Sequence, residues 1–164
     1  KDLTLKEAFL VSCVPCYQKI AREIGYKRMK AYLKKLNYDT MVFDQKTLDS
    51  FWLEGDSKIT QFQQIQFLKK FYFSELPISK RTESIVKNIM KMEQTNDYVL
   101  SAKTGLSVTN GQDNGWYVGY LEVKNKVYFF ATNLEPEKGT TRDQFIPARL
   151  NATKEAFQNL KILK

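Results

Sequence analysis

The sequence predicts an α+β fold in which a helical part precedes an antiparallel sheet and a last helix packs on that sheet. Apolar residues recur with helical spacing over about residues 1–95. After Asn96 the spacing changes, and aromatic and β-branched residues gather in runs typical of strands. The chain has 164 residues, of which 43% are hydrophobic, so it can bury a core. We therefore expect one domain, with the strands and the last helix over about 96–164.

Local signals place the helices of the first part. Capping-box spacing, which satisfies free N–H groups where a helix begins, occurs twice: Thr4 with Glu7, and Thr60 with Gln63. Pro15 suits the first turn of a second helix, which Gly25 ends. Further helices are expected at about 27–36 and 82–92, and Leu76-Pro77 ends the helix that Thr60 begins. The segment 37–58 is predicted to be a loop.

Three strands are predicted, at 98–104, 116–123 and 127–134. Residues 124–126 make a short hairpin turn between the last two. The segment 107–115 contains Asn110-Gly111 and Asn114-Gly115, two pairs typical of turns, so it is predicted to be a loop. Pro147 is predicted to open the closing helix, which runs to about residue 162.

The charge balance is basic, with 26 Lys and Arg against 18 Asp and Glu and a net charge of +8. The lysines are scattered among acids, and the densest patch, at 27–35, has the spacing of a solvated helix face. We therefore expect no nucleic-acid partner. No apolar run approaches the roughly 18 residues that a membrane span needs. The first residues also lack the apolar region of a signal peptide.

The chain has no histidine, which excludes a Ser-His-Asp triad, a Cys-His pair and most catalytic zinc sites. A nucleophile in this chain would need a lysine or a carboxylate as its base. Cys13 and Cys16 follow a helical pattern, whereas a thioredoxin-like redox motif follows a strand. The pattern favours two small buried side chains, and in an oxidising compartment a disulfide is the alternative.

Lys103-Thr104-Gly105 lies at the end of a predicted strand and suits the binding of a carboxylate. Lys103 supplies a positive charge and Thr104 a hydroxyl. Gly105 has no side chain, so a substrate backbone can lie close to the strand. Three common residues recur by chance, so the surrounding motifs decide how much this one means.

Those motifs resemble the class D β-lactamases and the related β-lactam sensor domains, within the penicillin-binding transpeptidase-like family. The matching segments are Ser12-Cys13-Val14-Pro15, Phe51-Trp52-Leu53-Glu54-Gly55, Lys103-Thr104-Gly105, Trp116-Tyr117-Val118-Gly119 and Ile146-Pro147-Ala148-Arg149. Tyr38-Asp39-Thr40 departs from the family's Tyr-Gly-Asn. Only eleven residues precede Ser12, whereas the family's nucleophilic Ser-x-x-Lys lies several tens of residues before it. The chain resembles the C-terminal portion of such a domain.

The resemblance implies a role for each matching residue. Ser12 would relay a proton toward the lactam nitrogen, although a helix-end cap is an open alternative. Lys103 and Thr104 would hold the substrate carboxylate, with Arg149 adding a second anion contact. The N–H of Leu106 would join the oxyanion hole. Val14 would pack over the missing active-site lysine, and the indole N–H of Trp52 would bond the carbamate on that lysine. For both residues, ordinary core packing is the open alternative.

The expected activity is acyl transfer to a serine, with hydrolysis of a penicillin, by an extracytoplasmic protein. The alternative is a sensor or penicillin-binding domain that is acylated without turnover. Ser84 and Lys87 form the one Ser-x-x-Lys of the chain, but they lie after Ser12, in the wrong order for the family. We expect this chain alone to be inactive.

The resemblance implies no cofactor and no metal, and it implies a β-lactam or peptidoglycan-like ligand. An exposed strand edge should be covered by a second copy of the chain or by a complementing N-terminal segment.

Overall fold

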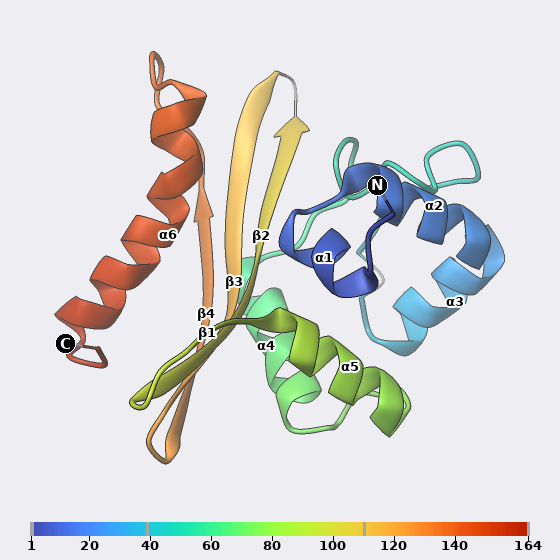
Figure 1. Cartoon of the computed structure of the whole chain (residues 1–164). Coiled ribbons are helices and arrows are strands. Elements are labelled where there is room, and N and C mark those ends of the chain that lie inside the picture. Colours follow the sequence, from blue (N-terminus) through green and yellow to red (C-terminus); the bar gives the residue numbers. More distant parts are fainter. Residues whose placement is uncertain (1, 39, 110, 164) are drawn as a thin grey trace.

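The computed structural model describes residues 2–38, 40–109 and 111–163, and its α+β architecture confirms the predicted fold class. A central antiparallel sheet separates two helical layers (Figure 1). The last helix covers one face of the sheet, and the helices of the first ninety residues form a lobe on the other side.

Most helices begin at a side-chain cap that the sequence shows. The helices are α1 (Leu5–Leu10), α2 (Val14–Ile24), α3 (Tyr26–Lys35), α4 (Gln61–Tyr72), α5 (Lys80–Met90) and α6 (Arg142–Asn159). The predicted capping boxes at Thr4 and Thr60 are both present. A third capping box, between Thr141 and Gln144, opens α6.

The prediction that Pro147 opens the closing helix was therefore wrong. Pro147 lies inside α6, which begins five residues earlier, at Arg142. An internal proline forfeits one backbone hydrogen bond of the helix. The capping box at Thr141 and the packing of α6 on the sheet outweigh that loss.

The sheet contains β1 (Lys91–Gln94), β2 (Tyr98–Thr109), β3 (Gln112–Val123) and β4 (Lys126–Leu134), in the order β1-β2-β3-β4. The strand β1 was not predicted, since the helix was expected to run to residue 92. The predicted loop over 107–115 was also wrong, because β2 and β3 stay paired from Tyr98 with Val123 to Thr109 with Gln112. Asn110, in the first of the two predicted turns, lies outside the described residues.

Alternating side chains of the strands build a core on each face of the sheet. One cluster of Leu68, Phe71, Leu76 and Met90 packs on Tyr120, between the sheet and the helical lobe. On the other face, Ala102, Tyr117, Leu121 and Phe130 pack with Phe157 of α6. No helix of the described residues is long and apolar enough to cross a membrane.

The middle of the sheet requires a glycine at position 119. A Cβ atom there would lie 2.2 Å from the carbonyl oxygen of Ser101 and 2.7 Å from the Cα of Ala102. The close approach of β2 and β3 at this point fixes the strand that carries Lys103.

Candidate functional site

Lys103 lies on β2, two residues after the pairing of β2 with β1 ends at Ser101. The strand β1 pairs with residues 99–101 only, so within the described residues the following stretch is a free edge. The ammonium of Lys103 donates hydrogen bonds to the hydroxyl of Ser12 and to the carbonyl oxygen of Thr104, the latter at 2.9 Å. It also lies 5.5 Å from the ring centroid of Phe9 on α1. The helical lobe and the sheet therefore meet at this cation.

The charge of Lys103 has no acidic partner among the described residues. Within the described part of the chain, no carboxylate oxygen lies within 4 Å of its ammonium nitrogen. Burial, and to a lesser extent the positive charge of Arg149, lowers the pKa of Lys103 to about 8. The side chain is therefore mostly charged at neutral pH, and an anionic ligand would relieve its lack of a counterion.

Arg149 reaches β2 from α6, which covers the face of the sheet opposite to the helical lobe (Figure 1). Its side chain is 7% exposed, and its Nη1 donates a hydrogen bond to the carbonyl oxygen of Gly105 at 3.1 Å. Its Nε is buried without a hydrogen-bond partner among the described residues. The structure thus brings Arg149 to the Lys103-Thr104-Gly105 segment through the backbone of Gly105.

Gly115 leaves the space that Arg149 occupies, and the sequence analysis missed this role. A Cβ atom at Gly115 would lie 3.3 Å from Nη1 of Arg149 and 2.9 Å from the ring of Phe145. We had assigned Gly115 to a turn, although a glycine inside a strand also signals a close approach by another group.

Ser12 lies at the junction of α1 and α2, with a left-handed backbone at φ 52°. Its N–H donates to the carbonyl oxygen of Phe9 at 3.3 Å. The N-cap of α2 is Cys13, whose sulfur accepts the N–H of Cys16 at 3.3 Å. The hydroxyl of Ser12 contacts Lys103 and does not cap α2. Its left-handed backbone closes the end of α1, so the alternative of a helix-end cap holds for the backbone of Ser12 and not for its side chain.

Cys13 and Cys16 form a disulfide across the first turn of α2. Both residues are half-buried. The interpretation of these cysteines as two small buried thiols was therefore wrong, and the alternative disulfide is the one present. It forms because the first turn of a helix brings the N-cap close to the third residue that follows.

The remaining predicted residues are half-buried. Leu106 stands opposite Gly115 in the β2–β3 register. The indole ring of Trp52 packs edge-on against Phe51, at 5.2 Å between centroids. The N–H of Val108 donates to the carbonyl oxygen of Leu53 at 3.2 Å, which ties the Trp52 segment to β2. Thr104, Leu106, Trp52 and Val14 keep their assigned roles as predictions.

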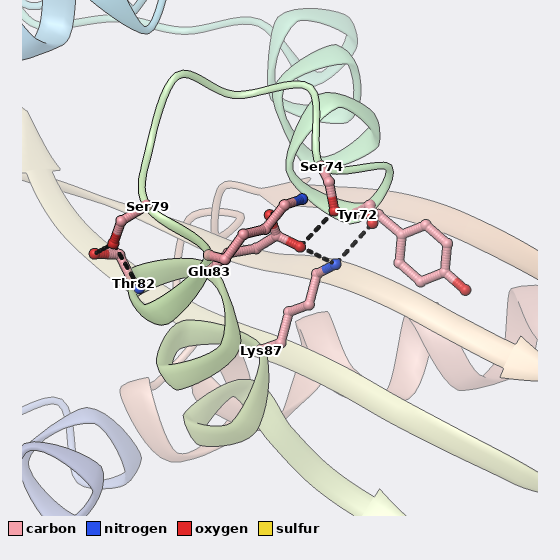
Figure 2. Close-up of polar contacts among 7 residues, drawn as sticks. Tyr72, Ser74, Ser79, Thr82, Glu83 and Lys87 are labelled. Atoms are coloured by element: carbon pink, nitrogen blue, oxygen red, sulfur yellow. Dashed lines mark hydrogen bonds and ion pairs between the residues drawn. The ribbon is translucent and has the colours of Figure 1, made fainter.

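The Ser-x-x-Lys at 84–87 has different surroundings. Lys87 donates to a carboxylate oxygen of Glu83 and to the carbonyl oxygen of Tyr72, both at 2.8 Å (Figure 2). Glu83 also accepts a hydrogen bond from Ser74, and these contacts lower its pKa to about 2. Ser84 is exposed. This group of residues holds the end of α4 to α5.

The comparisons with known proteins identify the family. Residues 1–158 match the family described as the penicillin binding protein transpeptidase domain. The chain belongs to this family. Among its relatives is the β-lactamase OXA-10 of Pseudomonas aeruginosa, 41% identical over 138 residues, a match that covers 82% of this chain and 52% of the relative. The chain thus spans about half the length of that curated relative.

Among solved structures, the chain is similar to class D β-lactamases. The class D β-lactamase YbXI from Nostoc has a TM-score of 0.93 and 40% identity, over 99% of this chain and 67% of that one. The C-terminal domain of the BlaR penicillin receptor of Bacillus licheniformis has a TM-score of 0.83 and 32% identity, over 95% and 63%. The suspected resemblance is confirmed at the level of the family.

Proposed function

We propose that this chain forms the C-terminal part of the binding cleft of a class D β-lactamase-like serine hydrolase, which opens the β-lactam ring through an acyl-enzyme. The observation that carries the proposal is the ammonium of Lys103, which has no carboxylate partner among the described residues and lies against the Ser12 hydroxyl. A half-buried cation on a free strand edge suits a ligand that carries a carboxylate beside an amide.

Each residue of the cleft then has a chemical role. Lys103 and the Thr104 hydroxyl bind the substrate carboxylate. Arg149 adds positive charge through its position behind Gly105 and orients the Gly105 carbonyl by its hydrogen bond. The N–H of Leu106 stabilises the negative oxygen of the tetrahedral intermediate. Ser12, next to Lys103, passes a proton to the lactam nitrogen as the ring opens.

The nucleophile lies outside these 164 residues. Lys87 is engaged by Glu83 and by the backbone of Tyr72, so it does not act as a base for Ser84. A Ser-x-x-Lys elsewhere would supply the attacking serine and its base, with Val14 and Trp52 beside them. Covalent catalysis cannot proceed without its nucleophile, so the chain alone binds weakly and does not turn over.

An additional segment would cover the free edge of β4. A groove of about 720 Å³ runs along β4 between α4 and the end of α6. Phe73 and Leu160 line it, and they are 53% and 69% exposed. Phe62 on α4 is 82% exposed. Since this chain covers 67% of the Nostoc structure, we assign the groove to a complementing segment that pairs with β4.

The test of this proposal uses the purified chain, a chromogenic cephalosporin and benzylpenicillin. We expect no hydrolysis above buffer and no penicilloyl adduct by intact mass. We also expect weak benzylpenicillin binding, followed by NMR, that Lys103→Met weakens by about tenfold or more. Turnover that Ser12→Ala or Ser84→Ala removes would overturn the assignment of the nucleophile. Binding of unchanged affinity in Lys103→Met would overturn the assignment of the cleft.

A second candidate is a β-lactam sensor that is acylated but does not turn over, and the similarity to the BlaR receptor domain supports it. The rate of deacylation of a complete domain distinguishes the two. Both candidates place the protein outside the cytoplasm, and the Cys13–Cys16 disulfide supports that location.

A further inference from the structure

We infer that the Cys13–Cys16 disulfide is a positioning element that holds the Ser12 hydroxyl against the ammonium of Lys103. The disulfide begins one residue after Ser12 and closes the first turn of α2. Ser12 and Lys103 are 91 positions apart in the sequence, so their contact depends on how the α1–α2 junction is fixed.

The backbone of the junction shows why a covalent link is effective there. Ser12 has φ 52°, the left-handed conformation that ends α1, and its N–H donates to the carbonyl oxygen of Phe9 at 3.3 Å. On its N-terminal side, the N–H of Cys13 donates to the carbonyl oxygen of Ala8 at 2.9 Å. On its C-terminal side, Cys13 is fixed to Cys16 by the disulfide and by the N–H···S contact of 3.3 Å.

Sulfur is a weak acceptor compared with the hydroxyl or carboxylate oxygens that cap most helices. The start of α2 therefore lacks a strong cap, and the disulfide supplies the constraint. Without it, Cys13 can rotate away from its N-cap geometry, and Ser12 turns with it. The cation–π contact of Lys103 with Phe9 comes from α1, so it does not depend on this turn.

The positioning is sensitive to reduction because both cysteines are half-buried rather than enclosed. A dithiol reductant breaks the S–S bond and leaves two thiols, while the reductant gives up two electrons and two protons and closes its own disulfide. One consequence rests on the proposed function. If Ser12 relays the proton and Lys103 binds the carboxylate, reduction separates these two groups.

The experiment follows the titration of Lys103 by NMR in the full 164-residue chain labelled at lysine Cε, so its result does not depend on β-lactam chemistry. The Ser12 oxygen accepts a hydrogen bond from the charged form of Lys103. Losing that bond destabilises the charged form, so the pKa of Lys103 should fall by about half a unit, which is an about threefold larger acid dissociation constant. We expect this change on reduction with a dithiol and also in oxidised Ser12→Ala.

Two comparisons make the result specific. In Ser12→Ala, reduction should produce no further change, whereas in the matched control Ser84→Ala it should act as in the parent chain. Cys13→Ala/Cys16→Ala removes both the crosslink and the sulfur cap without any reductant, so its Lys103 should show the same fall in pKa as the reduced chain, and it serves as the test if reduction itself unfolds the protein. Identical Lys103 titrations with and without the disulfide, or an equal redox response in Ser12→Ala, would overturn the inference.

Discussion

Lys87 and Lys103, each paired with a serine by motif or by contact, have opposite surroundings. Lys87 contacts the carboxylate of Glu83 and a backbone carbonyl, so its charge is neutralised within the fold. Lys103 contacts a hydroxyl, a carbonyl and an aromatic ring, and no carboxylate of the described residues lies within 4 Å of it. Lys87 carries the Ser-x-x-Lys spacing, yet Lys103 has the environment of a binding group.

The comparison shows that the two lysines differ in their counterion, and the proposed binding role of Lys103 rests on that difference rather than on motif spacing. A lysine that pairs with a buried carboxylate stabilises the fold and has little left to offer a ligand. A lysine buried without such a partner costs stability and gains most when an anion binds.

The largest effect should come from changing the strand that holds Lys103. Gly119→Ala places a methyl group 2.2 Å from the carbonyl oxygen of Ser101, so β2 and β3 must separate. We expect a loss of about 3 kcal/mol in the free energy of unfolding. Denaturant unfolding measures it. Gly105→Ala is the matched control, since its Cβ would meet Trp116 at an ordinary 3.5 Å. Equal stability of the two variants would contradict the packing at Gly119.

Exchanging the two lysines for methionine separates binding from stability. Lys103→Met should weaken benzylpenicillin binding by about tenfold or more, because a charge-assisted contact is lost. Its melting temperature should not fall, since an uncompensated buried charge is removed. Lys87→Met should leave binding unchanged but lower the melting temperature by about 4 °C, because Glu83 loses its cation. NMR titration and thermal melts of both variants test this, and the reverse pattern would refute the distinction.

Acid should destabilise the fold through Glu83. Its pKa is lowered to about 2 in the folded chain, so the unfolded chain takes up the proton first as the pH falls. The stabilisation is complete above about pH 4.5 and is lost progressively toward about pH 2. Glu83→Gln should flatten this part of the curve of melting temperature against pH. A Glu83→Gln curve parallel to that of the parent would show that other carboxylates dominate.

The mildest change should be seen in the pH dependence of binding. Because the pKa of Lys103 is lowered to about 8, affinity for benzylpenicillin should fall as the pH rises through that value. In Lys103→Arg the charge persists, so this decline should disappear even if the affinity at pH 7 is lower. Affinities measured from pH 6 to 10 test this. A decline at the same pH in the arginine variant would assign the titration to another group.

The sequence was sufficient where the determining signals are local. The capping boxes at Thr4 and Thr60 lie within one helical turn, so the starts of α1 and α4 could be predicted. The Lys103-Thr104-Gly105 segment could be found because its neighbours also match a known family. The transpeptidase family could be recognised from the sequence because its motifs occur along most of the chain.

The sequence failed where a distant contact decides the local structure. Asn114-Gly115 carries a turn signal, but Gly115 lies in β3 because Phe145 and Arg149 fill the space beside it. The strand β1 has exposed residues without apolar alternation, so only its pairing with β2 reveals it. The surroundings of the two lysines were likewise invisible, since spacing alone does not show which carboxylate a cation meets.

The order of the strands in the sheet is also their order in the chain. Their contacts join chain neighbours, so the entropy lost in closing loops between them is small and the four strands can assemble early in folding. The cleft closes later, because Ser12 and Lys103 are 91 positions apart and Arg149 and Gly105 are 44 apart. In a refolding experiment with pulsed hydrogen exchange, the amides of β2 and β3 should be protected before the helix that follows Ser12. The sheet would then serve as the template on which the two ends of the chain complete the cleft.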